Sequence, residues 1–139
     1  MPVVTKTLQF QTNGDTDLVD ITTEVAASVS ESDISSGTVT VFVPGSTAGI
    51  TTIEYESGAV RDFQEAIERI APKSIHYHHD QRWGDGNGYS HVRAALLGAS
   101  LSVPFSSSKL LLGTWQQIIL VDFDNRPRTR NIILQIIGE

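Results

Sequence analysis

The stretch QIILVDFDNRPRTRNIIL, residues 117–134, is the most informative part of the sequence for the architecture of the protein. Residues 118–121 and 132–134 are apolar runs without the alternation of a strand that has one solvent-exposed face. Runs of this kind are typical of strands that are buried on both faces. We therefore expect central strands over residues 114–123 and 130–137. The turn residues at 124–128 predict that these two strands form a hairpin.

The rest of the chain alternates between β-forming runs and helical patterns. The segment from residue 57 to 71 carries the clearest apolar helical stripe, and Pro72 ends it. This order predicts one α+β domain over residues 1–139, with a mixed or largely antiparallel sheet, sandwich-like, and about three short helices. The further expected strands are 3–11, 18–21, 38–43, 48–55, 100–105 and 110–112, and the expected helices are 22–32, 57–71 and 91–97.

Two central strands that are apolar on both faces need cover on both sides. Three short helices cover roughly one face, so a second cover is required. Oligomerisation through the other face is the simple solution. A sheet that folds over itself into a sandwich is the alternative.

Composition narrows the functional class. The chain has 139 residues, no cysteine, and ten Lys plus Arg against sixteen Asp plus Glu, a formal net charge of -6. Thiolate metal sites and disulfides are therefore excluded, and the negative charge argues against a nucleic-acid partner. No apolar run reaches the ~18 residues of a membrane span, so we expect no membrane partner and a cytoplasmic location.

All four histidines lie between residues 76 and 91, three of them in the stretch HYHHD at 76–80. If this stretch is extended, His76 and His78 point to one side and His79 to the other. Two histidines from the stretch can then meet His91, and imidazole is the commonest metal ligand and neutral-pH acid–base group. Surface histidines in a loop are the plain alternative.

The glycine-rich loop GDGNG, residues 84–88, precedes the helix expected from His91, with Ser90 as its cap. Glycines let backbone N–H groups turn toward a ligand, and a helix N-terminus attracts anions. Asn87, Gly88 and Ser90 are thus candidate phosphate contacts, although the same residues also make an ordinary tight turn.

Two further groups are candidates for ligand contact. Ser46 and Thr47 follow a strand in the turn GSTAG, where a structural turn is the favoured interpretation, and their hydroxyls can hold a ligand. Arg130 suits bidentate contacts with phosphate or carboxylate.

Six segments of the sequence stand out together: STAGITTIE (46–54), YHHD (77–80), NGYSH (87–91), ALLGASLSVP (95–104), LLLGTWQQIILVDFD (110–124) and RTRNIILQIIGE (128–139). In this order they resemble the YjbQ-like family, which is associated with secondary thiamine-phosphate synthase activity. The resemblance covers the chain from about residue 3 to its end, and LGTWQ at 112–116 is its most specific piece.

The resemblance implies an α+β fold, a homotrimer, and catalytic roles for His79, His91 and Glu54. It also implies a late substrate-binding arginine at Arg130, and Lys109 stands near the place of a family arginine. Many members have a histidine where this chain has Gly45, so His78 or His76 substitutes as a metal ligand beside His79 and His91, or a water does, or the site is weaker.

The implied reaction joins a pyrimidine pyrophosphate to a thiazole phosphate with release of pyrophosphate, as a weak side activity of a protein whose own substrate is another phosphorylated small molecule. Such a step needs cations at the leaving group, normally a divalent metal such as Zn²⁺ or Mg²⁺. The alternatives are a histidine-based, metal-dependent hydrolase and a non-catalytic trimeric ligand-binding protein.

Overall fold

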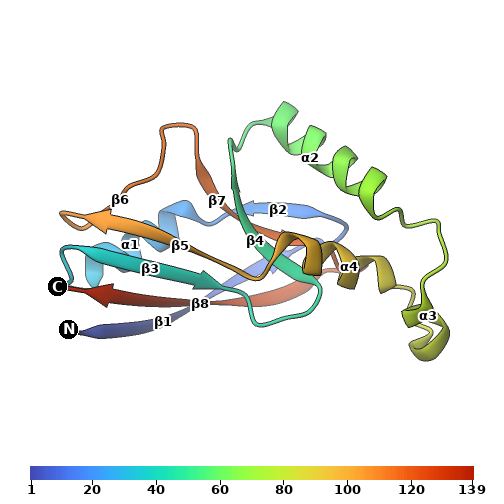
Figure 1. Cartoon of the computed structure of the whole chain (residues 1–139), viewed down its shortest axis with the longest axis horizontal. Helices are drawn as coiled ribbons and strands as arrows, with labels where there is room; N and C mark the ends of the chain where they lie inside the picture. The colour runs from blue at the N-terminus through green and yellow to red at the C-terminus, as the bar shows by residue number, and fades with distance from the viewer.

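Two antiparallel sheets pack against each other through their inner faces (Figure 1). The computed structural model describes all residues from Met1 to Glu139. The larger sheet has five strands in the order β1-β8-β3-β5-β6, and the smaller sheet has three in the order β2-β7-β4. The strands are β1 (Val3–Thr12), β2 (Asp17–Asp20), β3 (Gly37–Phe42), β4 (Ala48–Ile53), β5 (Ser100–Ser106), β6 (Lys109–Leu110), β7 (Gln117–Asp122) and β8 (Arg128–Gly138).

Four helices complete the chain: α1 (Thr22–Glu31), α2 (Ser57–Ile70), α3 (His78–Trp83) and α4 (Gly88–Leu97). The α+β class, the antiparallel pairing and the sandwich-like packing are confirmed. None of the helices has the length and apolar character needed to cross a bilayer. The two chain ends lie side by side at one end of the molecule, and α3 lies at the opposite end (Figure 1).

The predicted hairpin between the two apolar runs is wrong, because β7 and β8 belong to different sheets. The division lets Ile118 and Leu120 of β7 meet Ile132 and Leu134 of β8 across the core, and all four side chains are fully buried. If β7 and β8 were neighbours in one sheet, their side chains would point to the same two faces of that sheet and would not meet across a core. The turn after β7 therefore joins two layers.

Helices provide the second cover that β7 requires. Its other face carries Ile119 and Val121, which pack with Ile67 of α2 and Ala94 of α4. β8 alternates along its length: its inner face is buried, whereas the residues of its outer face are exposed or half-buried, so the expectation that it is buried on both faces is wrong. The homotrimer stays a prediction, and β7 no longer needs it.

The segment expected to be extended around the histidines is helical from His78 to Trp83, so the expected opposite orientation of His78 and His79 does not apply. α4 begins at Gly88, three residues before the expected start at His91. The count of about three helices missed α3 because six residues carry too little periodicity to be recognised.

Candidate functional site

The starts of α3 and α4 bring His79 and His91 together. The centroids of the two imidazole rings lie 4.3 Å apart, with the planes tilted by 38°. Gly88 makes this approach feasible, because a Cβ at this position would lie 2.6 Å from the Cβ of Tyr77, closer than side chains pack. The glycine of the loop thus serves helix packing, which holds the two histidines side by side.

Two carboxylates face His79. Its Nδ1 lies 3.6 Å from Oδ1 of Asp80 and 3.6 Å from Oδ1 of Asp85. These distances exceed a normal hydrogen bond, and this buried Nδ1 has no hydrogen-bond partner. The three ligand atoms lie within 4.8 Å of one another. One nitrogen and two carboxylate oxygens at this spacing fit a divalent metal ion.

The surroundings of His91 lower its pKa, which favours the neutral imidazole. Burial lowers the pKa of the imidazole, and the neighbouring His79 lowers it further. The carboxylates of Asp124, Asp85 and Asp80 oppose this shift without cancelling it. A neutral imidazole can accept a proton or donate a lone pair to a metal.

The positive end of α4 already has an anionic partner within the chain. The N–H of Gly88 donates to Oδ1 of Asp80 over 2.8 Å. The buried Oδ1 of Asn87 and Oγ of Ser90 have no hydrogen-bond partner. We call His79, Asp80, Asp85, Asn87, Ser90 and His91 the histidine corner.

A second group, which we call the arginine network, adjoins the histidine corner. It consists of Thr47, Asp122, Asp124, Arg128 and Arg130. Arg130 pairs with both carboxylate oxygens of Asp122, through Nε at 2.7 Å and Nη2 at 2.9 Å, and its Nη2 also donates to Oγ1 of Thr47 over 2.7 Å. Asn87 joins the two groups, because its Nδ2 donates to Oδ1 of Asp124 over 3.2 Å.

The Asp124 carboxylate stays ionised despite its burial. Burial acts to raise its pKa, but hydrogen bonds from Asn87 and from the N–H of Asn125 lower it, as do the charges of Arg128 and Arg130. The net effect is a lowered pKa. Asp124 is therefore a fixed negative charge between the arginine network and the histidine corner.

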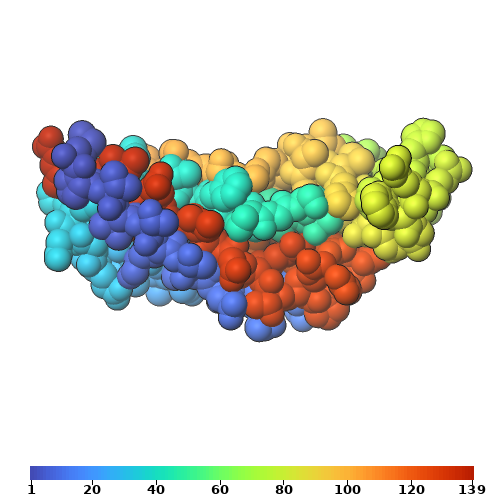
Figure 2. All heavy atoms as spheres, turned by 90° about the horizontal axis from the view of Figure 1, so that it is seen from below, coloured from blue at the N-terminus to red at the C-terminus, as the bar shows by residue number.

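A hollow lies beside both groups, between α4 and the β3–β4 connection. Figure 2 shows this connection, in cyan-green, next to the orange-red segment that joins β7 and β8. His91 lines the hollow together with small residues, so a ligand there would contact the histidine corner directly. The other lining residues are Gly45, Ser46, Ala48, Ala94, Ala95, Gly98 and Ala99.

Most of the predicted site residues gather here, and three do not. Glu54 follows the far end of β4, roughly 20 Å along the strand from Thr47. Lys109 on β6 is separated from the hollow by the length of β5, also roughly 20 Å. His78 stacks edge-on against His76, with centroids 5.0 Å apart, outside the group around His79. The residues that do gather are Ser46, Thr47, His79, Asn87, Gly88, Ser90, His91 and Arg130.

The sequence reasoning missed three carboxylates: Asp85, Asp122 and Asp124. The two that follow the apolar run of β7 carried a signal, because a charged residue that ends a buried strand must have a partner. Asp85 carried none, since an aspartate in a glycine-rich loop is ordinary turn composition.

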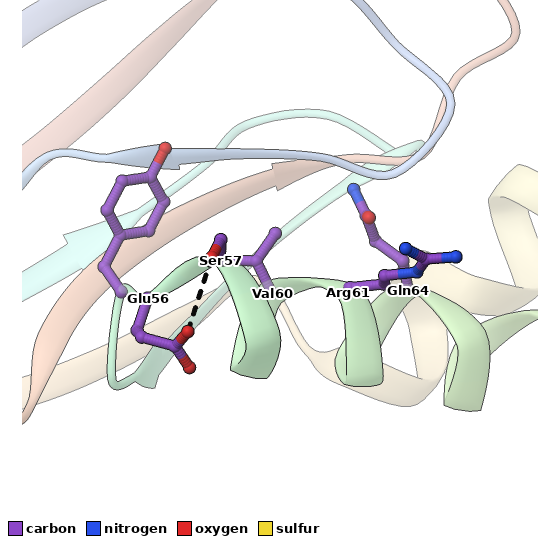
Figure 3. Close-up of a pocket in the computed structure, with 6 residues that line it drawn as sticks. Glu56, Ser57, Val60, Arg61 and Gln64 are labelled. Carbon is purple, nitrogen blue, oxygen red and sulfur yellow. Dashed lines mark hydrogen bonds between the residues drawn. The ribbon is translucent and has the colours of Figure 1, made fainter.

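A separate hollow runs along the first turns of α2 (Figure 3). It is lined by Tyr55, Glu56, Ser57, Val60, Arg61 and Gln64. The Glu56 carboxylate accepts from the N–H groups of Gly58 and Ala59, and these bonds lower its pKa. This carboxylate is thus engaged in capping α2, and none of the predicted site residues lines the hollow.

Fold and site together define a small two-sheet α+β protein with a histidine–carboxylate group between two helix starts. The chain belongs to the UPF0047 family of YjbQ-like proteins, whose family model matches residues 6–139. The family resemblance of the sequence is thereby confirmed.

Relatives match over nearly their whole length. The chain is 38% identical to a UPF0047 protein of Archaeoglobus fulgidus, over 92% of this chain and 97% of that protein. It is 36% identical to the UPF0047 protein YugU of Bacillus subtilis, over 96% of this chain and 98% of YugU. Among solved structures, a YbjQ-like protein of unknown function from Sulfolobus solfataricus superposes with a TM-score of 0.93 at 35% identity, covering 99% of each chain.

Proposed function

We propose that the protein is a metal-dependent enzyme that acts on a phosphorylated small molecule at the histidine corner. The observation that supports this most directly is the buried, unpartnered Nδ1 of His79 beside two carboxylates. A buried polar atom without a partner costs about 1–3 kcal/mol of folding free energy. A ligand that satisfies this atom offsets the cost.

A divalent metal ion would be held by His79, Asp80 and Asp85. The nitrogen ligand favours Zn²⁺ or a similar transition metal over Mg²⁺, which prefers an all-oxygen shell. When bound, such an ion neutralises charge on a phosphate or pyrophosphate leaving group. His91, whose ring lies 4.3 Å from the ring of His79 and whose lowered pKa favours the neutral form, would accept or return a proton at a ring nitrogen.

The charge balance favours the metal as the first ligand. Asp80, Asp85, Asp122 and Asp124 carry four negative charges, whereas Arg128 and Arg130 carry two positive charges, which leaves −2. A free phosphate would be repelled by this surplus, and a cation would be attracted. A bound cation would then attract the phosphate.

The proposed substrate, a phosphorylated small molecule, rests on two arguments: a bound metal ion would attract phosphate, and the family resemblance implies phosphorylated substrates. Asn87, Ser90, Ser46 and Thr47 present polar groups around the hollow, at which phosphate oxygens would be held. The joining of a pyrimidine pyrophosphate to a thiazole phosphate, as a weak side activity, stays within this proposal. In one chain, Glu54 and Lys109 lie too far away to take part, and they would act only from another subunit of a homotrimer.

A second candidate function is metal-dependent hydrolysis. The lowered pKa of His91 supports it, because a neutral imidazole beside a metal can take a proton from an attacking water. Both candidates need the same metal site, and release of pyrophosphate or of free phosphate distinguishes them.

The test is calorimetric titration of untagged protein with Zn²⁺ and with Mn²⁺. We expect about one ion per chain, and affinity reduced at least about tenfold in His79→Ala. His76→Ala is the matched control, because His76 lies outside the group and its loss should leave affinity unchanged. Equal affinities in wild type and His79→Ala would refute the proposed site, and metal binding without turnover of phosphorylated substrates would indicate a binding protein.

A further inference from the structure

We propose that Gly45 opens a notch in which Nη1 of Arg130 binds a phosphate oxygen of the substrate, so that Gly45 is a specificity-determining position. The inference rests on the proposed function for the phosphorylated nature of the substrate. To that proposal the inference adds the atom that would bind the phosphate, Nη1 of Arg130, and the residue that leaves this atom accessible, Gly45.

The guanidinium of Arg130 is fixed on two of its three nitrogens. Nε and Nη2 pair with Asp122, and Nη2 also donates to Thr47. The side chain is only 7% exposed. Nη1 has no hydrogen-bond partner within the chain, so two N–H donors of a rigidly held, buried group remain available.

The free donors point toward Gly45. A Cβ placed on this residue would lie 3.0 Å from Nη1, and no other atom would lie within 4 Å of it. The backbone of Gly45 does not have a positive φ, so the local conformation does not demand a glycine. The missing side chain therefore leaves a space that gives a ligand access to Nη1.

The notch adjoins the hollow described above, because Gly45 borders both, although Arg130 is not among the residues that line the hollow. Gly45, Ser46 and His91 all line this hollow. A phosphate at Nη1 would therefore lie next to the hollow that His91 lines. One substrate can place one group against Arg130 and a second against the metal.

Electrostatics predict that the notch binds phosphate weakly on its own and more tightly when a metal ion is bound at the histidine corner. Asp122 shares the charge of Arg130 through two short hydrogen bonds, and Asp124 lies 3.9 Å from Nη2. A phosphate oxygen at Nη1 gains directed hydrogen bonds but little net attraction from charge. A cation bound at the histidine corner would supply the missing attraction.

A side chain larger than hydrogen at position 45 would cover Nη1, because even its Cβ would lie 3.0 Å from this nitrogen.

The experiment is calorimetric titration with inorganic pyrophosphate and with phosphate, each in the presence and absence of Mn²⁺. Gly45→Ala adds only the Cβ that covers Nη1, and Gly45→Ser is a second variant with the same Cβ. Gly113→Ala is the matched control, because its Cβ would make ordinary contacts of 3.5 Å or more in a remote loop. Thermal unfolding confirms that each variant is folded.

We expect pyrophosphate binding to weaken at least about tenfold in both Gly45 variants and to be unchanged in Gly113→Ala. Affinity for Mn²⁺ alone should stay the same in all of them. Pyrophosphate affinity equal to wild type in Gly45→Ala, or no binding of either anion by the wild-type protein, would overturn the inference. Pyrophosphate binding that depends on Gly45 in a protein that binds no metal would instead refute the proposed function and leave the notch standing.

Discussion

The sandwich core and the histidine corner differ in whether they contain buried polar atoms that lack a hydrogen-bond partner. The main core is formed by 16 buried apolar residues from both sheets and α1. The histidine corner holds three of the four buried side-chain polar atoms without a partner, on His79, Asn87 and Ser90. Burial without a partner costs free energy, so a region that keeps such atoms sacrifices stability for binding. The contrast supports the proposed placement of the site at the histidine corner, without reference to relatives.

The largest effect is expected in the arginine network beside the histidine corner, because this network contains a buried ion pair. Asp122→Ala leaves the 7% exposed Arg130 without its carboxylate partner and should lower the free energy of unfolding by about 3–5 kcal/mol. Urea denaturation measures the loss. Asp122→Asn, which keeps one acceptor, should lose less, and a loss below about 1 kcal/mol in Asp122→Ala would contradict the assigned pairing.

A truncation in the sandwich core should lower the free energy of unfolding almost as much, without changing the affinity for metal. Leu120→Ala removes a fully buried side chain between the sheets and should cost about 3 kcal/mol. Leu111→Ala, at a residue 59% exposed, is the control and should stay within about 0.5 kcal/mol. Metal affinity should be equal in both variants, and a change in Leu120→Ala alone would mean that core and corner are coupled.

A bound metal ion should raise the free energy of unfolding of the wild type but not that of His79→Ala, which lacks the nitrogen ligand of the proposed site. A metal at 100 times its dissociation constant adds about 2.7 kcal/mol to the free energy of unfolding. His79→Ala should lose this increment, whereas its metal-free stability should change by less than about 1 kcal/mol. Thermal unfolding with and without Zn²⁺ tests both halves. A large loss in the metal-free state would assign His79 a structural role.

Two buried serines test the same contrast between core and corner, with smaller expected changes in the free energy of unfolding. Ser90 and Ser28 are both buried, but only Ser28 has a hydrogen bond, from its Oγ to the carbonyl of Glu24 over 2.9 Å. Ser90→Ala should therefore be neutral or raise the free energy of unfolding by up to about 1 kcal/mol, and Ser28→Ala should lower it by about 1 kcal/mol. The same loss in both variants would show that Ser90 has a partner in the folded protein.

The smallest effect concerns acid stability at an exposed ion pair. Hydrogen bonding from Lys73 lowers the pKa of Asp15 below 3.8 against the opposing effect of burial, and its charge and a hydrogen bond from Tyr89 add to the lowering. A lowered folded pKa stabilises the fold above the unfolded pKa, and this contribution is lost as the pH falls through the folded value. Asp15→Asn should flatten the stability profile below about pH 4 by well under 1 kcal/mol. An unchanged profile would show that the pair is fully screened.

The sequence predicted the core better than the corner, for a physical reason. Apolar runs and β-branched residues identified the buried strands, because burial is a property of the segment itself. Pairing depends on the whole chain, so the division of β7 and β8 between two sheets was not predictable from either run.

At the site, the histidines and the glycine loop were recognisable by composition, and the short helix α3 was not. The grouping of His79 with Asp80 and Asp85 depends on that helix. Glu54 directly follows a strand that was recognised, but its distance from the site follows from strand direction, which local patterns do not reveal. The arginine network joins residues up to 83 positions apart, beyond any local signal.

The pairing of β1 with β8 has a consequence for synthesis on the ribosome. β1 lies at the edge of its sheet, with β8 as its only neighbour, and Val3 is paired with Ile137. At ~10 residues per second, the first strand waits roughly ten seconds for its partner to be made. Long-range pairing of this kind folds slowly, and an unpaired strand invites wrong contacts. The polar residues Thr5, Thr7, Gln9 and Gln11, which alternate along β1, and the charge of Lys6 on the other face, make wrong pairing during this wait less favourable.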